Sequence, residues 1–155
     1  MKRIIVTSLA LSMSLFSLTA KSEDMRPYLK IDQAWKGLAA CKTLADSKGW
    51  NMAVVIIDRG LDVVGSFRMD GALPPAYKGA TLKAETALSW SMSTVKVGEF
   101  VGKNPEFKQF PGLLPIGGGE AIFSESGKLI AAVGVAGGYV KHDEECAKAV
   151  VDAIQ

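Results

Sequence analysis

The chain has 155 residues, of which 18 are basic and 16 acidic, giving a formal net charge of +2. Hydrophobic residues make up 48% of the sequence, so the chain can bury one sizeable core but is too short for two ordinary domains. A nearly neutral chain lacks the positive surface that nucleic-acid binding requires, so we exclude nucleic-acid-binding proteins.

The N-terminus has the pattern of a secretory signal peptide. Lys2 and Arg3 precede an uncharged apolar run over residues 4–18, and the small residues Ala20 and Ser22 offer a cleavage site. This run is shorter than the roughly 20 residues that a membrane-spanning helix needs. We therefore expect export without stable membrane insertion.

Cleavage would leave residues 23–155 as a single domain, located in the periplasm or outside the cell. Removing residues 1–22 changes the formal net charge from +2 to −1, because Lys2, Arg3 and Lys21 are lost. The basic character of the whole chain therefore belongs to the predicted signal peptide.

The first element expected after the signal peptide is a helix that begins near Asp32 and ends at Gly49, where a left-handed cap is expected. Its apolar stripe is expected to contain Trp35, Leu38, Ala39, Cys41 and Ala45. The second cysteine, Cys146, falls in the last expected helix. In an oxidising compartment the two cysteines can form a disulfide if these helices are neighbours; otherwise they are two buried thiols.

A β-hairpin is expected next. Residues 52–57 are an unbroken apolar run, residues 58–60 read Asp-Arg-Gly and predict a tight turn, and residues 61–69 predict the second strand. Apolar and polar residues alternate in that second strand. The period of two places Arg68 and Asp70 on the same face.

The spacing then predicts one long helix over residues 76–97. One face carries mostly small residues, namely Ala80, Ala84, Ala87, Leu88 and Ser91. Such a stripe permits close approach, either to a sheet or to another subunit. Residues 98–115 contain proline, glycine and three phenylalanines, and are expected to form a long loop that is functional or lies at an interface.

A second hairpin is expected towards the C-terminus. Three glycines at residues 117–119 lead into a strand over residues 120–124, and residues 128–135 predict its partner. A final helix begins near His142 or Asp143. Two hairpins predict an antiparallel sheet flanked by helices, an α/β fold of the α+β type rather than a doubly wound parallel sheet.

The glycine clusters do not have the pattern of a nucleotide site. Gly118 and Gly119 enter a strand, and no Lys-Ser/Thr pair of a P-loop follows them. Gly137 and Gly138 precede a helix whose first turn already holds acidic side chains, which disfavours phosphate. The glycines supply positive φ angles or close backbone contacts, or else they allow a flat ligand to approach the backbone.

Three charged residues are candidates for binding a carboxylate-bearing ligand such as a haem propionate. Arg68 and Asp70 share a strand face, and Lys83 follows on the next expected helix. The alternative is a solvated ion pair that joins the strand to the helix. Thr86, on the same helix as Lys83, lies either on the surface or in the lining of a pocket.

His142 is the only histidine of the sequence, so any metal site or catalytic triad built on histidine depends on it. Beside Asp143, at the expected start of a helix, it is either an exposed or capping residue or an axial iron ligand of haem. Tyr139, Tyr77, Met69 or a non-protein ligand are the other candidates for an iron ligand.

Five short motifs cover nearly the whole predicted domain: Arg-Met-Asp-Gly-Ala at residues 68–72, Lys-Ala-Glu-Thr-Ala at 83–87, Leu-Pro-Ile-Gly-Gly-Gly at 114–119, Gly-Val-Ala-Gly-Gly at 134–138 and Asp-Glu-Glu-Cys-Ala at 143–147. Together, their order and spacing resemble the GlcG/HbpS haem-binding family, formerly a domain of unknown function. The resemblance is more specific than any single motif.

The resemblance implies a profilin-like three-layer architecture, assembly into homo-oligomers and haem as the suspected cofactor. The positions that match the family pattern are Arg68, Asp70, Lys83, Thr86, Gly118, Gly119, Gly137, Gly138 and Asp143. Two departures stand out: Ala136 replaces the serine usual in relatives, and the Glu-x-x-Glu surface motif of some members is absent. Binding of free ferric ions is therefore not expected.

Three hypotheses of function follow. The leading one is an exported, non-catalytic haem-binding protein that sequesters or senses haem. The second is a small-metabolite-binding protein or accessory enzyme of a glycolate-type catabolic operon, in which Lys83 beside Asp70 would act in acid–base chemistry. The third is a structural partner of a membrane sensor, with the small-residue helix as its subunit interface.

Overall fold

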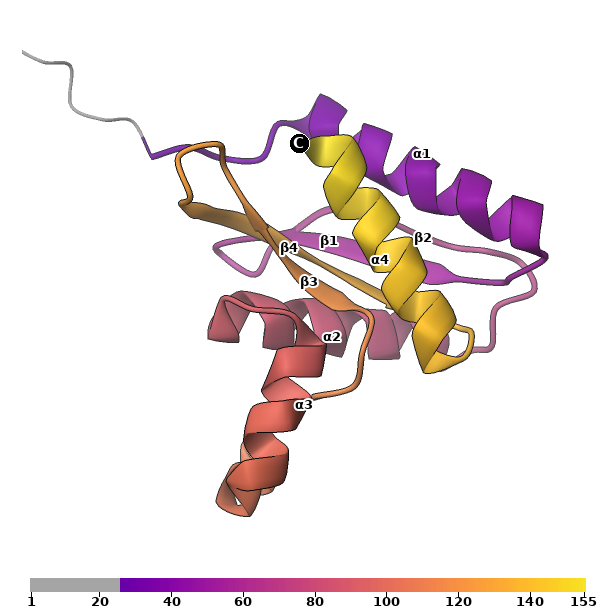
Figure 1. The fold of residues 1–155 in the computed structure, drawn as a ribbon. Coiled ribbons are helices and arrows are strands. Elements are labelled where there is room, and N and C mark those ends of the chain that lie inside the picture. The colour runs from indigo at the N-terminus through magenta and orange to yellow at the C-terminus, as the bar shows by residue number, and fades with distance from the viewer. Residues whose placement is uncertain (1–25) are drawn as a thin grey trace, which may run out of the picture.

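The computed structural model describes residues 26–155, so the predicted signal peptide lies outside the described residues. The elements follow the order α1 (Ile31–Lys48), β1 (Ala53–Asp58), β2 (Val63–Arg68), α2 (Ala76–Trp90), α3 (Thr94–Lys103), the 3₁₀ helix η1 (Pro105–Gln109), β3 (Gly119–Phe123), β4 (Leu129–Ala136) and α4 (Val140–Ile154). Figure 1 shows their arrangement. Within the described part of the chain, no helix is both long and apolar enough to cross a membrane.

The four strands form one antiparallel sheet in the order β2-β1-β4-β3. The two predicted hairpins, β1–β2 and β3–β4, are both present, and they join where β1 pairs with β4. Val54, for example, lies opposite Phe67 of β2 on one side and opposite Val135 of β4 on the other. The predicted α+β class is therefore confirmed.

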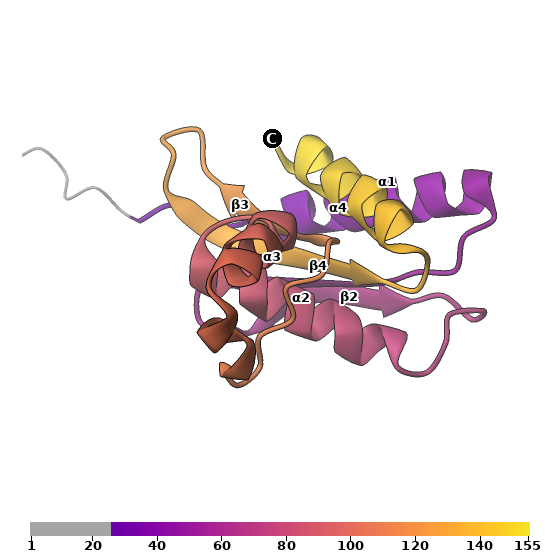
Figure 2. The same ribbon diagram turned by 60° about the horizontal axis from the view of Figure 1, so that its bottom comes forward.

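Helices cover both faces of this sheet, which gives three layers (Figure 2). Side chains alternate along β1, so Val54 and Ile56 join the core beneath α1 and α4, whereas Val55 and Ile57 join the core against α2. Both central strands are almost fully buried, which explains why their sequences are continuous apolar runs rather than alternating ones.

The small-residue stripe of α2 packs on the sheet and not on another subunit. Ala80, Ala84 and Ala87 are fully buried in the core between α2 and the sheet. A Cβ atom at Gly134 of β4 would collide with the backbone of Ala80 and Ala84, so helix and strand are in backbone contact there. The hypothesis that this stripe forms a subunit interface is therefore wrong.

The single helix predicted over residues 76–97 is two helices. Ser91 has a left-handed conformation, with φ 51°, and ends α2. Ser93 then begins α3 as its N-cap, because its Oγ accepts a hydrogen bond from the N–H of Lys96 at 3.4 Å. No glycine or proline marks this break, and the apolar spacing continues across it, so the sequence pattern predicts one continuous helix.

The segment predicted as a long loop is largely helical. α3 and η1 project from the body of the domain as an arm (Figure 1). Trp90, Phe100 and Phe107 form a small aromatic cluster inside this arm, with ring centroids 5.1–5.6 Å apart. Phe100 and Phe107 therefore hold the arm together through ring contacts, whereas Phe110 is outside the cluster and 56% exposed.

Helices α1 and α4 lie side by side on one face, and a disulfide joins Cys41 to Cys146 across them. Their Cα atoms are 4.9 Å apart. Of the stripe predicted for α1, Leu38, Cys41 and Ala45 are buried. The prediction is wrong for Trp35, which is 57% exposed, and for Ala39, which is also exposed. Gly49 has the left-handed conformation expected of the C-cap.

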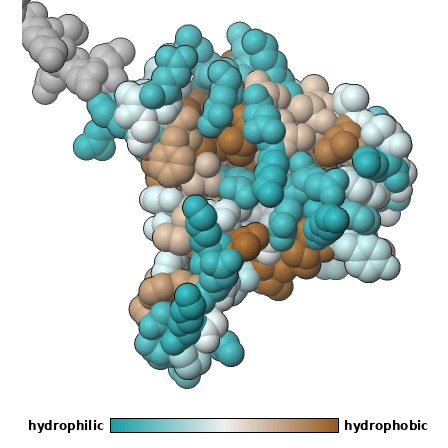
Figure 3. Space-filling view, viewed as in Figure 1, coloured by the Kyte–Doolittle hydropathy of each residue, from teal (hydrophilic) through white to brown (hydrophobic). Residues whose placement is uncertain are grey.

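The start of α1 also differs from the prediction. Asp32 lies within the first turn, whereas Lys30 is the capping residue and its N–H donates to Gln33 Oε1 at 3.1 Å. Figure 3 shows the molecule from the same side as Figure 1, with hydrophilic side chains in front of the domain and apolar residues exposed between them.

Candidate functional site

The topology of the sheet brings three chain segments to one edge. Ala53, the first residue of β1, lies opposite Arg68 at the end of β2 and opposite Ala136 at the end of β4. Because neighbouring strands are antiparallel, the start of the middle strand meets the ends of both neighbours. Residues 50–51, 69–71 and 137–139 therefore surround the same edge.

The first cavity at this edge, here called the His142 groove, has a volume of about 410 Å³. It is lined by Gly49, Trp50, Asn51, Gly71, Gly137, Gly138, Tyr139 and His142. The imidazole of His142 stacks on the indole of Trp50, with ring centroids 4.2 Å apart and planes 10° apart. Tyr139 meets the same imidazole edge-on, at 5.4 Å.

The ring nitrogens of His142 make no hydrogen bond to any residue in the described part of the chain. The side chain is half-buried, in the first turn of α4. Stacking on Trp50 holds the ring plane by its face and does not engage the ring nitrogens. The imidazole thus has a fixed orientation beside a cavity and a ring nitrogen that can coordinate a metal, as expected of a metal ligand.

The second cavity, here called the apolar groove, has a volume of about 570 Å³. It is lined by Trp35, Leu38, Ala39, Lys42, Asn51, Phe67, Arg68, Met69, Asp70 and Gly71. Asn51 and Gly71 line both grooves, so the two cavities adjoin. Both volumes lie within the range typical of small-molecule sites.

Two cationic side chains stand at the apolar groove. The guanidinium of Arg68 donates a hydrogen bond to the backbone oxygen of Ala72 at 2.6 Å, which orients it. Lys42 pairs with Asp46 at 2.6 Å, but both side chains are about half exposed. Exposed pairs of this kind contribute little energy, so Lys42 can change partner at low cost when an anion binds.

Lys83 does not reach Asp70; its partner is Asp143. Lys83 Nζ donates to Asp143 Oδ2 at 2.7 Å and to the backbone oxygen of Val135 at 3.0 Å. Lys83 and Asp143 are 4% and 3% exposed, so the pair is sealed from solvent. The acid–base role suggested for Lys83 beside Asp70 is therefore not supported by the structure.

The second carboxylate oxygen of Asp143 serves the turn after β4. Asp143 Oδ1 accepts a hydrogen bond from the N–H of Gly138 at 3.1 Å. Burial raises the pKa of Asp143 above its ordinary value, although the hydrogen bond and charge of Lys83 and the bond from Gly138 act in the opposite direction. The buried pair thus connects α2, β4 and the turn that leads to His142.

At two of the predicted positions, a positive φ angle and close packing require glycine. Gly118 has φ 110°, and a Cβ atom there would lie 2.7 Å from Asp143 Cβ and 3.1 Å from Lys83 Nζ. Gly137 has φ 137°, and a Cβ atom would collide with the backbone of Asn51. Gly118 makes room for the ion pair, and Gly137 makes room for the edge of the sheet.

The remaining predicted positions divide between surface and interior. Thr86 is buried and its Oγ1 accepts the N–H of Leu114 at 2.9 Å, while the N–H of Gly119 donates to Thr94 Oγ1 at 2.9 Å. These contacts hold the loop that leads into β3, and Thr86 also lines a separate small cavity of about 120 Å³. At the grooves the structure places Arg68, Asp70, Gly137, Gly138 and His142, whereas Lys83, Thr86, Gly118 and Gly119 lie behind them.

Sequence reasoning missed several lining residues, above all Trp50, Asn51 and Lys42. Trp50 and Asn51 stand between the helix-ending Gly49 and a buried strand. That position at a sheet edge was a usable signal. Lys42 offered none, because a solvated lysine on a helix has the same pattern.

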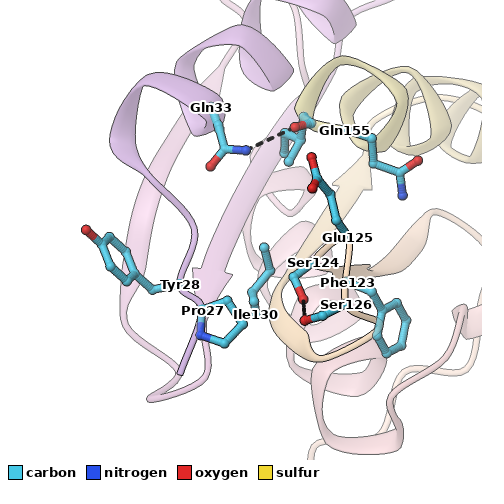
Figure 4. Close-up of a pocket in the computed structure, with 10 residues that line it drawn as sticks. Pro27, Tyr28, Gln33, Phe123, Ser124, Glu125, Ser126, Ile130 and Gln155 are labelled. Atoms are coloured by element: carbon cyan, nitrogen blue, oxygen red, sulfur yellow. Dashed lines mark hydrogen bonds between the residues drawn. The ribbon is translucent and has the colours of Figure 1, made fainter. Parts of the chain in front are cut away.

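A larger cleft, of about 650 Å³, lies elsewhere (Figure 4). It is lined by Pro27, Tyr28, Gln33, Phe123, Ser124, Glu125, Ser126, Ile130, Ile154 and Gln155. Its lining contains no histidine, lysine or arginine, and none of the predicted site residues. It provides a natural control surface for binding experiments.

Glu120, on the edge strand β3, is the second carboxyl group whose environment changes its acidity. Burial raises its pKa above the ordinary 4.5, opposed by the charges of Lys148 and Lys96 and reinforced by Glu144. The raised pKa means that the folded chain holds this proton more tightly than the unfolded chain does. Protonated Glu120 therefore contributes stability below pH 4.5, and this contribution is lost as the pH rises through the folded-state pKa.

We therefore expect Glu120→Gln to raise the free energy of unfolding relative to the wild type at pH 7, and to raise it less at pH 4. The glutamine cannot ionise, so it avoids the cost of a buried carboxylate. Urea unfolding of both proteins at the two pH values measures this. A difference between the two proteins that is the same at both pH values would contradict the assignment.

The comparisons with known proteins agree with this architecture. The structure of a double mutant of HbpS from Streptomyces reticuli superposes with a TM-score of 0.79 and 27% identity, covering 98% of this chain and 99% of that chain. A second HbpS structure is 30% identical with a TM-score of 0.79, over 86% and 95% of the two chains. A structure of PduOC in complex with haem is 24% identical with a TM-score of 0.75, over 82% and 95%.

No curated protein sequence matches the chain significantly. Residues 29–152, however, match the protein family described as "Haem degrading protein HbpS-like". This match spans the domain from the residues before α1 to the last turn of α4. The chain therefore belongs to the HbpS-like family, as the five sequence motifs indicated.

Proposed function

We propose that this chain is an exported haem-binding protein whose site is formed by the His142 groove and the adjoining apolar groove. The observation that carries the proposal is the junction of an apolar cavity, two cations and an oriented imidazole at one sheet edge. The HbpS-like family description and the haem complex of PduOC, which has the same fold, support haem as the ligand class.

The macrocycle, the propionates and the iron of a haem would each find suitable side chains in the two grooves. Trp35 and Phe67 offer apolar surface for the macrocycle, and Arg68 and Lys42 offer positive charge for the propionates. His142 offers a ring nitrogen for the iron. Bound haem would supply a redox-active iron, and the protein groups bind and orient it.

Among the candidate iron ligands, the structure favours His142. Tyr77 is on α2, where its hydroxyl pairs with Ser66 Oγ at 3.0 Å. The sulfur of Met69 accepts a weak hydrogen bond from the N–H of Met52 at 3.4 Å. Tyr139 lines the same groove as His142 but is 80% exposed, so it is the weaker alternative.

Export is supported by two independent features. The signal-like pattern of residues 1–22 is one, and the Cys41–Cys146 disulfide is the other, since disulfides persist mainly in oxidising compartments. We place the protein in the periplasm or outside the cell. Homo-oligomers and a membrane sensor partner stay predictions, and the buried stripe of α2 is not available for either.

We infer sequestration or sensing rather than turnover of an unrelated metabolite. Lys83, the candidate acid–base residue, is buried and already bonded to Asp143 and Val135. The family description favours a second function, oxidative degradation of the bound haem. A Soret band that decays under peroxide, rather than persisting, would distinguish degradation from storage.

The location of the site is tested by two exposed aromatic residues. We expect Trp35→Ala to weaken haemin binding by about 10- to 100-fold, because a buried apolar contact contributes about 1.5–3 kcal/mol. Absorbance titration of the purified protein with haemin measures the dissociation constant. Tyr28→Ala is the matched control, since Tyr28 is similarly exposed but lines the other cleft.

Equal effects of the two substitutions would show that haemin binds to apolar surface in general. A larger effect of Tyr28→Ala would move the site to the other cleft (Figure 4). Absence of saturable binding by the wild type would reject the proposed function and favour a small metabolite as the ligand.

A further inference from the structure

The position of His142 depends on a tight turn between β4 and α4. Tyr139 is the N-cap of α4, but its side chain makes no capping hydrogen bond. The backbone oxygen of Tyr139 accepts the N–H groups of His142 at 2.8 Å and of Asp143 at 3.1 Å. A Cβ atom at Gly138 would lie 3.1 Å from His142 Cβ, so this turn and the histidine are packed directly together.

The turn is fixed from behind by Asp143, the residue after His142. One carboxylate oxygen accepts from the N–H of Gly138, at 3.1 Å, and the other from Lys83, at 2.7 Å. Lys83 extends from α2, in the layer on the other side of the sheet, and also donates to Val135 at the end of β4. The carboxylate therefore ties the turn to the opposite layer.

This arrangement is unusual for a contact that only holds layers together. Burying an ion pair costs desolvation energy, and an apolar pair of similar volume is often as stable. What an apolar pair cannot provide is an acceptor for the N–H of Gly138. The carboxylate thus holds the turn before His142 in one conformation, which an apolar side chain at the same place would not do.

We propose that Asp143 and Lys83 are positioning residues for His142: Lys83 orients the carboxylate of Asp143, which holds the Gly138 turn and so aims the imidazole into its groove. The inference rests on the proposed haem site. Neither residue touches the ligand, because both are buried behind the groove. Their effect on haem therefore passes through the turn at Gly138 and the geometry of His142 that this turn sets.

Two double variants separate positioning from folding. Lys83→Met with Asp143→Asn removes both charges and keeps an oxygen that accepts the N–H of Gly138. Lys83→Met with Asp143→Leu also removes both charges but leaves no acceptor. Neither variant leaves a buried unpaired charge, so we expect both to fold, and thermal unfolding of the haem-free proteins verifies this.

The readout is the absorbance spectrum of the haemin complex, compared with that of His142→Ala. We expect the asparagine variant to keep the wild-type spectrum. The leucine variant should shift towards the spectrum of His142→Ala and lose about tenfold or more in haemin affinity, the usual scale for groups that support a metal ligand. Metal-free protoporphyrin IX, which has no iron to ligate, should bind both double variants equally.

The two proposals fail in different ways. If His142→Ala changes the wild-type spectrum but both double variants match the wild type, the positioning role is overturned and the haem site stands. If the leucine variant also loses protoporphyrin IX, the groove itself has collapsed and the positioning role is likewise overturned. If wild-type protein binds no haemin, or its spectrum is indifferent to His142→Ala, the proposed site fails and the inference with it.

Discussion

Lys83→Met is expected to lower the free energy of unfolding by about 3–5 kcal/mol, because it leaves the carboxylate of Asp143 buried without its counter-ion. Lys83 and Asp143 are 4% and 3% exposed and 2.7 Å apart, so solvent cannot replace the missing partner. Urea or guanidinium denaturation of the purified protein measures the loss. It is one of the two largest effects expected in the domain.

The matched control is the double variant Lys83→Met with Asp143→Asn, which removes both charges. We expect it to recover most of the stability, so the effects of the two substitutions are strongly non-additive in a double-mutant cycle. If Lys83→Met alone were as mild as the double variant, the pair would be exposed or mobile in solution and not the sealed contact described above.

Loss of the Cys41–Cys146 disulfide is the second large effect. The bond closes a sequence separation of 105 residues, and the chain-entropy model assigns about 4.7 kcal/mol to a loop of about 100 residues. We expect Cys41→Ala with Cys146→Ala to lower the free energy of unfolding by about 4–5 kcal/mol. Chemical denaturation of the oxidised wild type and of the double variant compares the two.

Reduced wild-type protein is the control for this experiment, because it keeps both sulfur atoms and lacks only the bond between them. Its free energy of unfolding should be close to that of the double alanine variant. Mass spectrometry of protein directed to the periplasm of an expression host counts the thiols. Two free thiols there, or equal stability of oxidised and reduced protein, would contradict the assigned role of the bond.

Much of the sheet could be predicted because its signals are local. Residues 52–57 form a continuous apolar run, and the Asp-Arg-Gly turn follows them directly, so β1 and the hairpin were visible in the sequence. The pairing of β1 with β4, which builds the site, joins distant segments. Only the family resemblance, and not the pattern of residues, implied that architecture.

Where the prediction failed, no local signal marked the true structure. Ser91 breaks the helix in a left-handed conformation that glycine normally adopts, so the boundary between α2 and α3 was hidden. Trp35 fits the apolar period of α1 but is 57% exposed, since its side chain lines a groove rather than the core. Large apolar residues at binding surfaces follow the same period as core residues.

The sequence named some of the residues that line the two grooves, but not their arrangement. Arg68, Asp70, Gly137 and Gly138 belong to the sequence motifs, whereas His142 stood out as the only histidine of the sequence. All five line the two adjoining grooves. The partner of Lys83 lies 60 residues away in the sequence, and Asp70 was the nearer choice along the chain. An ion pair across the sheet depends on tertiary packing, which sequence spacing does not contain.

The central claim is that haem binds at this edge with His142 as the iron ligand, and the most direct measurement is a haemin titration of wild type and His142→Ala followed at the Soret band. The account predicts saturation at one haem per chain and a different Soret spectrum for His142→Ala. Absorbance that rises linearly without saturation, or identical spectra for the two proteins, would contradict it.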